Sequence, residues 1–303
     1  VYKRQMHKWL MKTAGCTWTC GGIAPYHAQD YQHNPGPLTV IEWLIQRAED
    51  DPHVAADLSP EGLLSAPETA VYDGLYSAKR RNDWLLGRWT AKRLVQAAVE
   101  KSGGPRLSYR EISILAAKDG SPELWLGEEG GLRRGDFNIS ISHSRDVSLC
   151  AAIPHPGIEI PAAHLLGADI EVIESRSDHF IQDYFTIEEK DLVRQAPIDH
   201  IDCLITAIWS GKEAALKAVR QGLRLDTRMV SCHLTYPGAS GHKQESLNWS
   251  PFTVRWIGPQ AKTNYPQLTG WWRVWQDFVL TLVVTVYPEQ EIGLDLGRHI
   301  DRQ

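Results

Sequence analysis

The order of the expected helices and strands constrains the fold of this chain more than any other feature of its sequence. One helical segment covers residues 58–104, where Pro67 is expected to divide it into two helices, and a second covers residues 178–222. A strand-like segment precedes each of them, at residues 38–45 and 168–173, and several alternating or apolar segments follow each. We therefore predict an α/β fold of two similar subdomains, with the functional site at their interface.

Residues 154–167 form the best candidate for a connection between the two halves, because they hold three prolines and two glycines. The subdomains are then expected at residues 37–153 and 168–290. Residues 1–36 show no clear period and are interpreted as an extension of uncertain order, and residues 291–303 as a tail.

Composition and charge argue against several classes of function. The net charge of −5 does not favour nucleic acid or an anionic membrane as a partner. The most apolar run, residues 278–286, is much shorter than the ~18 residues of a membrane helix and is typical of a buried strand. No apolar segment follows the basic start, so no signal peptide is expected. The odd number of five cysteines indicates a reducing, cytoplasmic setting.

Cys16 and Cys20 lie near His27 and His33, and these four residues could form a zinc site. No second pair of cysteines follows them. Two free cysteines are therefore the simpler interpretation.

Acidic residues occur at two places where the chain should be regular. In a strand, Asp169 and Glu171 point to the same side, and two neighbouring carboxylates repel unless a cation lies between them. In a helix over residues 208–223, Trp209, Glu213 and Lys217 share one face. Taken singly, the first pattern fits a strand edge facing water and the second fits a solvated Glu–Lys pair.

A basic segment stands out in this acidic chain. In a helix Arg81, Arg88 and Lys92 fall within about 40° of one another. Such a stripe suits an anion, and Gly87 would let a ligand approach the backbone. The alternative is a cationic surface beside buried Trp84. The cationic side chains of the segment are Lys79, Arg80, Arg81, Arg88, Lys92 and Arg93.

A strand-like segment, FNISISHS, ends in Ser142, His143 and Ser144, where a loop is expected to begin. Hydrogen-bond donors at a strand end can bind phosphate oxygens, and the alternative is a surface turn. A Ser/His hydrolase is a competing idea, but the sequence has no G-x-S-x-G motif to support it. Further on, Phe185 and Glu189 are four residues apart and share one side of a helix.

The order and spacing of these motifs carry more information than any one of them. The chain contains, in this order, the motifs LLGR, ISHS, GADIE, F-x-x-x-E and WSGKEAALKA. Together they resemble the motifs of the 4′-phosphopantetheinyl transferases of the Sfp type. The match covers residues 38–286 and is densest at residues 137–223. The resemblance implies two α/β halves related by a pseudo-two-fold axis. It also implies transfer of the 4′-phosphopantetheine arm of coenzyme A to a serine of an acyl or peptidyl carrier protein, with release of 3′,5′-ADP.

The resemblance also implies roles for individual residues. Asp169, Glu171 and Glu213 would bind Mg²⁺, with Mn²⁺ as a substitute, and Lys217 would lie beside the reacting phosphate. The base would be Glu213, Lys217 or a water molecule on the metal. Glu189, Trp209 and Lys212 would support the site. The residues expected to bind coenzyme A are Lys79, Arg80, Arg81, Arg88, Lys92, Ser142, His143 and Lys217.

The chain departs from the family pattern in the turn Gly120-Ser121-Pro122, where the family often has a lysine in the middle. Ala168 replaces a usual Val or Ile, and the linker is longer than the family needs.

Carrier proteins are typically acidic around their serine. A docking face is therefore expected on the helix at residues 178–194 and near Arg224 and Arg228, and the protein is expected to act as a monomer.

Two other readings stay open. One is another Mg²⁺-dependent phosphoryl enzyme, which would act on nucleotides without a carrier protein. The other is a non-catalytic binder of coenzyme A or of a carrier protein. A binder has little reason to keep Asp169, Glu171, Glu213 and Lys217 together.

Overall fold

The computed structural model describes residues 40–50, 62–127, 131–154, 165–234, 249–258 and 265–286. All of them lie in one unit of the chain, Gly36–Gln303. The predicted extension and tail, the cysteines Cys16 and Cys20, and most of the predicted linker lie outside the described residues. The domain boundaries given above therefore stay predictions.

In the described ranges, the first half contains two α-helices and six strands, with two short 3₁₀ helices. Its helix-rich segment forms two helices, as predicted, but Pro67 lies in the first turn of α3 and the break follows at Gly74. Proline suits this position, because the amide it lacks has no partner in the first turn of a helix. The elements are β1 (Glu42–Arg47), η1 (Ala48–Asp50), α3 (Ala66–Asp73), α4 (Ala78–Lys101), η2 (Tyr109–Glu111), β2 (Ile112–Ala116), β3 (Pro122–Leu126), β4 (Arg133–Arg134), β5 (Phe137–Ser144) and β6 (Val147–Pro154).

The second half repeats the order of strand, helices and several strands. Its elements are β7 (Leu166–Val172), α5 (Asp178–Tyr184), α6 (Ile187–Gln195), η3 (Ile198–His200), α7 (Ile201–Ala218), η4 (Gly222–Arg224), η5 (Thr227–Met229), β8 (Val230–Leu234), β9 (Ser250–Trp256), β10 (Gln267–Trp275) and β11 (Phe278–Val286). None of the helices in the described ranges is long and apolar enough to cross a membrane.

The described strands form three antiparallel sheets. The second half has one sheet in the order β7-β11-β10-β9-β8. The first half has two smaller sheets, β1-β6-β5 and β2-β3-β4, whose strands β5 and β3 lie close together. The spatial order of strands in the first half, β1-β6-β5-β3-β2, corresponds to the order β7-β11-β10-β9-β8 in the second half. The predicted α/β fold of two similar subdomains is confirmed.

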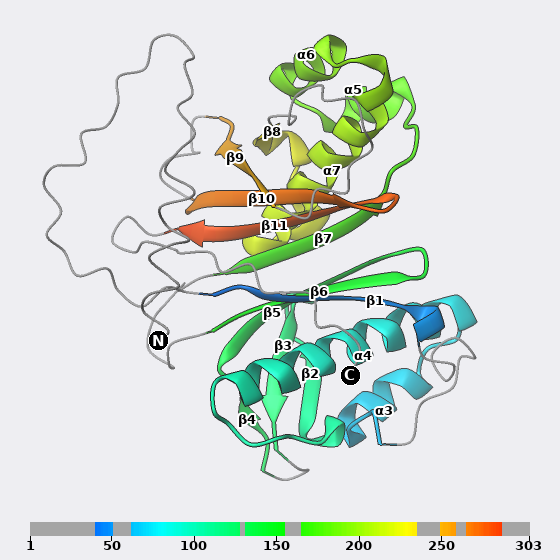
Figure 1. Ribbon diagram of the computed structural model, residues 1–303, viewed down its shortest axis with the longest axis vertical. Coiled ribbons are helices and arrows are strands. Elements are labelled where there is room, and N and C mark those ends of the chain that lie inside the picture. Colours follow the sequence, from blue (N-terminus) through cyan, green and yellow to red (C-terminus); the bar gives the residue numbers. More distant parts are fainter. Residues whose placement is uncertain are drawn as a thin grey trace, which may run out of the picture. The chain divides into compact units, whose positions relative to one another are not determined.

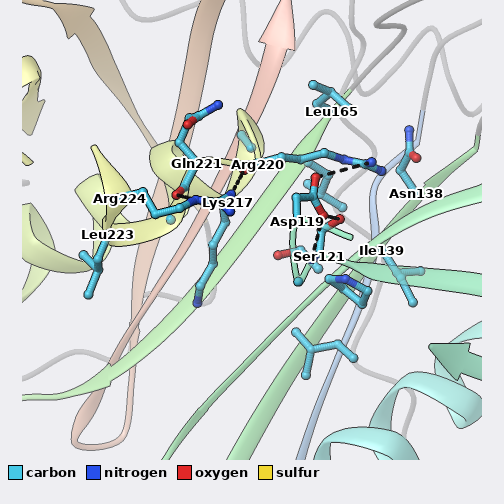
Figure 2. Close-up of a pocket in the computed structure, with 17 residues that line it drawn as sticks. Asp119, Ser121, Asn138, Ile139, Leu165, Lys217, Arg220, Gln221, Leu223 and Arg224 are labelled. Atoms are coloured by element: carbon cyan, nitrogen blue, oxygen red, sulfur yellow. Dashed lines mark hydrogen bonds and ion pairs between the residues drawn. The ribbon is translucent and has the colours of Figure 1, made fainter. Parts of the chain in front are cut away.

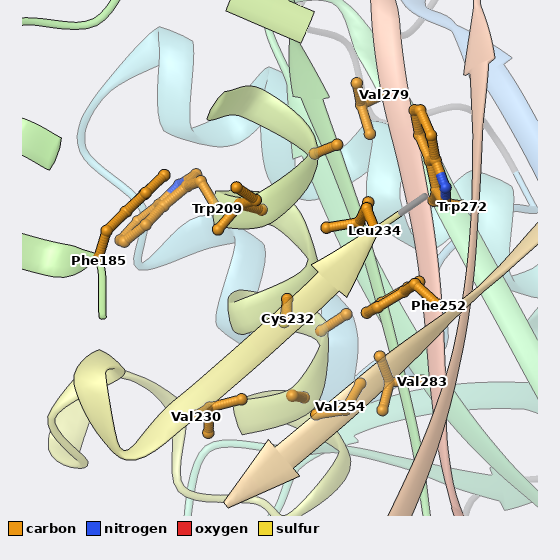
Figure 3. Packing of buried hydrophobic residues seen from close by; sticks show 14 of the residues in the cluster. Phe185, Trp209, Val230, Cys232, Leu234, Phe252, Val254, Trp272, Val279 and Val283 are labelled. Atoms are coloured by element: carbon orange, nitrogen blue, oxygen red, sulfur yellow. The ribbon is translucent and has the colours of Figure 1, made fainter. Parts of the chain in front are cut away.

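The five-stranded sheet packs against the β1-β6-β5 sheet, and the helices cover the outer faces of these two sheets (Figure 1). Successive side chains of β1 point to opposite faces of its sheet and therefore pack in two different layers. Trp43 and Ile45 pack against β7 and β11 in the next sheet, whereas Leu44 points to α4. In the second half, α7 lies over its sheet, where Trp209, Phe252 and Trp272 belong to one buried cluster (Figure 3).

Two matching ion pairs mark the internal repeat. In α4, Lys92 has no exposed surface, pairs with Glu68 of α3, and donates to the carbonyls of Leu63 at 2.7 Å and Tyr109 at 2.8 Å. In α7, Lys212 is equally buried and pairs with Glu189 of α6 at 2.8 Å. Each glutamate also accepts an amide from the first strand after the long helix.

This burial corrects the prediction that Lys92 binds coenzyme A. All of its observed partners are groups of the protein, and a ligand has no access to an ammonium that is fully buried. Helical periodicity correctly placed Arg88 and Lys92 on one face of α4. At Lys92, however, α3 covers this face. The sequence Trp-x-x-Lys occurs in both helices, at Trp89 and Trp209, so Lys92 is the first-half counterpart of Lys212.

A row of serines holds the edges of the two halves together. Ser140, Ser142 and Ser144 alternate along β5 and therefore share one side of the strand. Ser140 Oγ accepts the amide of Ala168 at 2.8 Å, and Ser144 Oγ accepts the amide of Val172 at 3.2 Å. Between them, Ser142 Oγ donates to Asp169 Oδ1 at 2.7 Å. The segment FNISISHS thus forms the seam along which the candidate site lies.

Candidate metal centre and anion pocket

Three acidic side chains from two elements meet at this seam. Asp169 and Glu171 of β7 and Glu213 of α7 each offer a carboxylate oxygen, and these oxygens all lie within 4.8 Å of one another. Gly167 permits the approach, because a Cβ at this position would lie only 1.8 Å from the carbonyl oxygen of Ala214. The structure therefore brings together the three residues that the sequence predicted as metal ligands.

Lys217, one turn beyond Glu213, contributes a positive charge to the same cluster. Its Nζ lies 2.6 Å from Asp169 Oδ1 and also donates to Ser142 Oγ at 2.9 Å. The other oxygen of Asp169, Oδ2, is buried and has no hydrogen-bond partner among the described residues. A buried carboxylate oxygen without a donor is costly unless a cation occupies the site.

The pKa values of the two glutamates in the acidic cluster, Glu171 and Glu213, are raised. Burial and the charge of Asp169 raise the pKa of Glu213 to about 8. The same two causes raise the pKa of Glu171 to about 7, against the opposing effect of Arg176. Burial lowers the pKa of Lys217, but Asp169 and Glu213 outweigh it, so the net pKa of Lys217 is raised. Three oxygen donors with excess negative charge fit a hard divalent cation such as Mg²⁺.

A cationic pocket adjoins the carboxylates in the first half, between α4, the turn at Gly120 and the end of β5. Lys79, Arg80, Arg88 and His143 line it. Asp83 also lines it, bonded to Lys79 at 2.9 Å and lying 3.6 Å from His143. The pocket therefore collects three of the five predicted basic residues of α4 and the predicted histidine.

Arg81 is not among the residues that line this pocket. Its Nε donates to the carbonyl of Leu75 at 2.7 Å, and its guanidinium lies over the ring of Tyr72 at 5.7 Å. These contacts hold the start of α4 to the preceding loop, so the predicted binding of coenzyme A by Arg81 has no support in the geometry.

A second pocket of about 420 Å³ lies between the two halves, and Lys217 is one of the residues that line it (Figure 2). Ser121, which stands where the family often has lysine, donates to Asp119 at 2.6 Å. Asp119 in turn faces Arg220 across the pocket at 4.0 Å. Sequence reasoning missed Asp119 and Arg176, which belong to no periodic pattern, and Asp83, whose i,i+4 spacing from Lys79 in α4 was the available signal.

The predicted supporting residues lie beneath the carboxylates. Trp209 is buried, with the ring of Phe180 at 5.0 Å and that of Tyr184 at 5.1 Å. Its indole also makes a hydrogen bond to Glu171 that lowers the pKa of this carboxyl. Glu189 and Lys212 form the buried pair described above, which fixes α7 to α6 and β8.

A duplicated α/β fold, three converging carboxylates and a cationic pocket together suit a protein that handles phosphate groups. Residues 165–282 match the model of the 4′-phosphopantetheinyl transferase superfamily. A holo-[acyl-carrier-protein] synthase of Geobacillus kaustophilus is 31% identical over 94 residues, which cover 31% of this chain and 69% of that protein. The chain belongs to this superfamily.

A second relative and one solved structure also match part of the chain. The holo-[acyl-carrier-protein] synthase of Streptococcus pyogenes serotype M1 is 32% identical over 107 residues, or 35% of this chain and 79% of that protein. Among solved structures, the holo-(acyl-carrier-protein) synthase of Bacillus anthracis in complex with CoA (3′,5′-ADP) is 20% identical, with a TM-score of 0.31. The alignment covers 39% of this chain and 96% of that one.

Proposed function

We propose that this chain transfers the 4′-phosphopantetheine group of coenzyme A to a serine of an acyl or peptidyl carrier protein and releases 3′,5′-ADP. Membership in the superfamily supports this activity, as do the names of its relatives. The observation that carries the proposal is the meeting of Asp169, Glu171 and Glu213 beside Lys217, next to a cationic pocket that suits the phosphates of a nucleotide.

Each part of the site has a task in this reaction. Asp169, Glu171 and Glu213 would hold Mg²⁺, which when bound polarises the pyrophosphate and neutralises the charge of the leaving group. Lys79, Arg80, Arg88 and His143 would hold the phosphates of the nucleotide, since phosphoryl transfer depends mainly on positioning and charge stabilisation.

The raised pKa of Lys217 favours one of its two suggested roles. The side chain keeps its proton at neutral pH, because Asp169 and Glu213 stabilise the ammonium. A charged ammonium can stabilise negative charge on the transferred phosphate but cannot accept a proton. We therefore assign Lys217 to charge stabilisation rather than to proton removal.

We further infer that the chain is of the Sfp type. The family model matches the second half, at residues 165–282, whereas this chain also carries a first half with the same strand order. Both walls of the site then come from one chain, which supports a monomer. The cytoplasmic setting and the lack of nucleic-acid or membrane partners stay predictions from charge and cysteine content.

The carrier protein is expected to dock on α5 and α6, which together cover the predicted segment 178–194, and on the rim near Arg224 and Arg228. Exposed apolar side chains lie along these segments, namely Tyr184 at 40%, Ile187 at 74% and Leu223 at 66% exposure. Apolar groups with neighbouring arginines suit an acidic partner surface.

Labelled coenzyme A incubated with Mg²⁺ and a panel of apo-carrier proteins tests the proposed reaction. Label should pass to at least one carrier. Release of phosphate from coenzyme A or ATP without a carrier would indicate the nucleotide-hydrolysing alternative. Binding without transfer or release would indicate the non-catalytic one.

His143 provides a test of the phosphate pocket. Because it is about half exposed at the pocket and contacts no carboxylate of the cluster within ion-pair distance, its loss should affect binding more than chemistry. We expect His143→Asn to raise the KM for coenzyme A about tenfold, the effect of one charge-assisted hydrogen bond, with little change in kcat. An unchanged KM in steady-state kinetics would place the nucleotide elsewhere.

Metal binding should tighten as the pH rises from 6 to 8. Ligands bind a metal in their deprotonated form, and Glu171 and Glu213 have pKa values of about 7 and about 8 without it. Both values lie above the ordinary 4.5, so the metal-free protein should also lose stability as the pH rises from about 4.5 to about 8. Mn²⁺ titrations and thermal unfolding at several pH values measure the two trends, and pH-independent Mn²⁺ affinity would contradict the raised pKa values.

A further inference from the structure

Arg176 lies between β7 and α5, in a segment to which the sequence assigned no role. Its guanidinium pairs with two acidic side chains, since Nη2 lies 3.3 Å from Glu171 Oε2 and Nη1 lies 3.1 Å from Glu174 Oε1. The side chain is only 22% exposed. Arg176 therefore contacts one of the three clustered carboxylates, Glu171, whereas Lys217 contacts another, Asp169.

Neighbouring groups fix the position of this arginine. The guanidinium lies 5.3 Å from the centre of the Phe180 ring, which in turn packs against Trp209. The preceding residue, Ser175, donates to both carboxylate oxygens of Asp202 near the start of α7, at 2.9 and 3.0 Å. The segment that carries Arg176 is thus attached both to α5 and to the helix that presents Glu213.

A further ion pair connects this segment to the first half of the chain. Glu174, the second partner of Arg176, also lies 3.6 Å from Arg145 in the turn after β5. The backbone amide of Val172 is held by Ser144 of that strand. The alternating series Glu171, Arg176, Glu174 and Arg145 therefore joins a carboxylate of the cluster to the turn that follows His143.

We propose that Arg176 is a positioning residue that holds the carboxylate of Glu171 toward Asp169 and Glu213. The inference rests on the proposed function in one respect, because it takes Glu171 as a metal ligand. A glutamate side chain beside a like charge turns away unless something holds it. Partners that orient metal-ligating carboxylates typically contribute a factor of about 10 to 100 in metal affinity.

If Arg176 positions Glu171, its removal should weaken metal binding, whereas its charge alone predicts the opposite change. This difference makes the proposal testable. The positive charge of Arg176 repels an incoming cation, so its removal without any loss of orientation would tighten metal binding. Positioning predicts that removal weakens binding. At a pH high enough to keep Glu171 deprotonated without Arg176, the direction of the change therefore distinguishes the two effects.

Titration with Mn²⁺, followed by the electron paramagnetic resonance signal of the free ion, measures this direction. We expect Arg176→Gln to raise the Kd for Mn²⁺ about tenfold and Arg176→Lys to raise it less. The matched control is Arg133→Gln, which removes an exposed arginine paired with Asp136 at 3.6 Å and should leave the Kd unchanged. An equal or lower Kd for Arg176→Gln, or no Mn²⁺ binding by the unaltered protein, would overturn the inference.

Two further measurements separate positioning from a purely structural role. In the transfer assay, Arg176→Gln should raise the Mg²⁺ concentration that gives half the maximal rate, with little change in the rate at saturation. Glu174→Gln removes one anchor of Arg176 and should weaken Mn²⁺ binding in the same direction but less, which keeps the test available if Arg176→Gln does not fold. Normal Mn²⁺ binding in both folded variants overturns the inference.

The Mn²⁺ titration uses neither coenzyme A nor a carrier protein. If the unaltered protein binds Mn²⁺ and the variants bind it more weakly, but no carrier is modified, then the proposed function fails and the inference about Arg176 stands.

Discussion

Glu213→Gln is expected to reduce the rate of phosphopantetheine transfer about a hundredfold or more, without unfolding the protein. Glutamine keeps the size of the side chain but removes the only carboxylate that α7 adds to the cluster. One metal ligand contributes several kcal/mol to the stabilisation of a phosphoryl-transfer transition state, and each 1.36 kcal/mol is a factor of ten in rate. Transfer of labelled phosphopantetheine under single-turnover conditions measures the loss.

Glu100→Gln is the matched control for this variant. It removes the same charge from an exposed position of α4, where Glu100 pairs with Arg106 at 3.5 Å, and it should leave the rate unchanged. If Glu213→Gln keeps most of the wild-type rate, the three carboxylates do not form a catalytic metal site. Retained binding of coenzyme A together with lost transfer would support the catalytic role over a simple binding role.

Lys92→Met is expected to lower the free energy of unfolding by about 3–5 kcal/mol, and Lys212→Met by a similar amount. Each lysine is fully buried and pairs with a buried glutamate, so its removal leaves an uncompensated carboxylate inside the protein. Each also donates to two backbone carbonyls, which lose their partner: those of Leu63 and Tyr109 for Lys92, and those of Thr227 and Val230 for Lys212. Urea unfolding followed by circular dichroism measures the difference.

Lys101→Met is the control in the same helix as Lys92. Lys101 is 58% exposed and pairs with Glu42 at 2.6 Å, and an exposed pair contributes at most about 1 kcal/mol. The folded fraction of Lys92→Met should keep the wild-type KM for coenzyme A. A raised KM with unchanged stability would restore Lys92 to the phosphate pocket and contradict its place in the structure.

The sequence predicted the carboxylate cluster well because periodicity determines directions within one element. The i, i+2 spacing placed Asp169 and Glu171 on one side of a strand, and the i, i+4 spacing placed Glu213 and Lys217 on one helical face. The family resemblance then related the two elements to each other. Gly167 is the residue that makes the contact possible, and its importance depends on the approach of Ala214 in space.

The basic helix shows where such reasoning fails. Periodicity gives the angle of Arg81, Arg88 and Lys92 around the helix axis, but it does not show which neighbour covers that face. Glu68, which neutralises Lys92, lies on another helix. Arg176 is a different case, since it follows a strand in an irregular segment, and only its contacts with Glu171 and Glu174 give it a role.

The most direct test of the central claim is the intact mass of an apo-carrier protein after incubation with this chain, coenzyme A and Mg²⁺. The account predicts that the carrier gains the mass of one phosphopantetheine group, that one 3′,5′-ADP appears for each modified carrier, and that a carrier with alanine in place of the acceptor serine stays unmodified. Consumption of coenzyme A with no change in carrier mass, or no reaction with any carrier by folded, metal-bound protein, would contradict it.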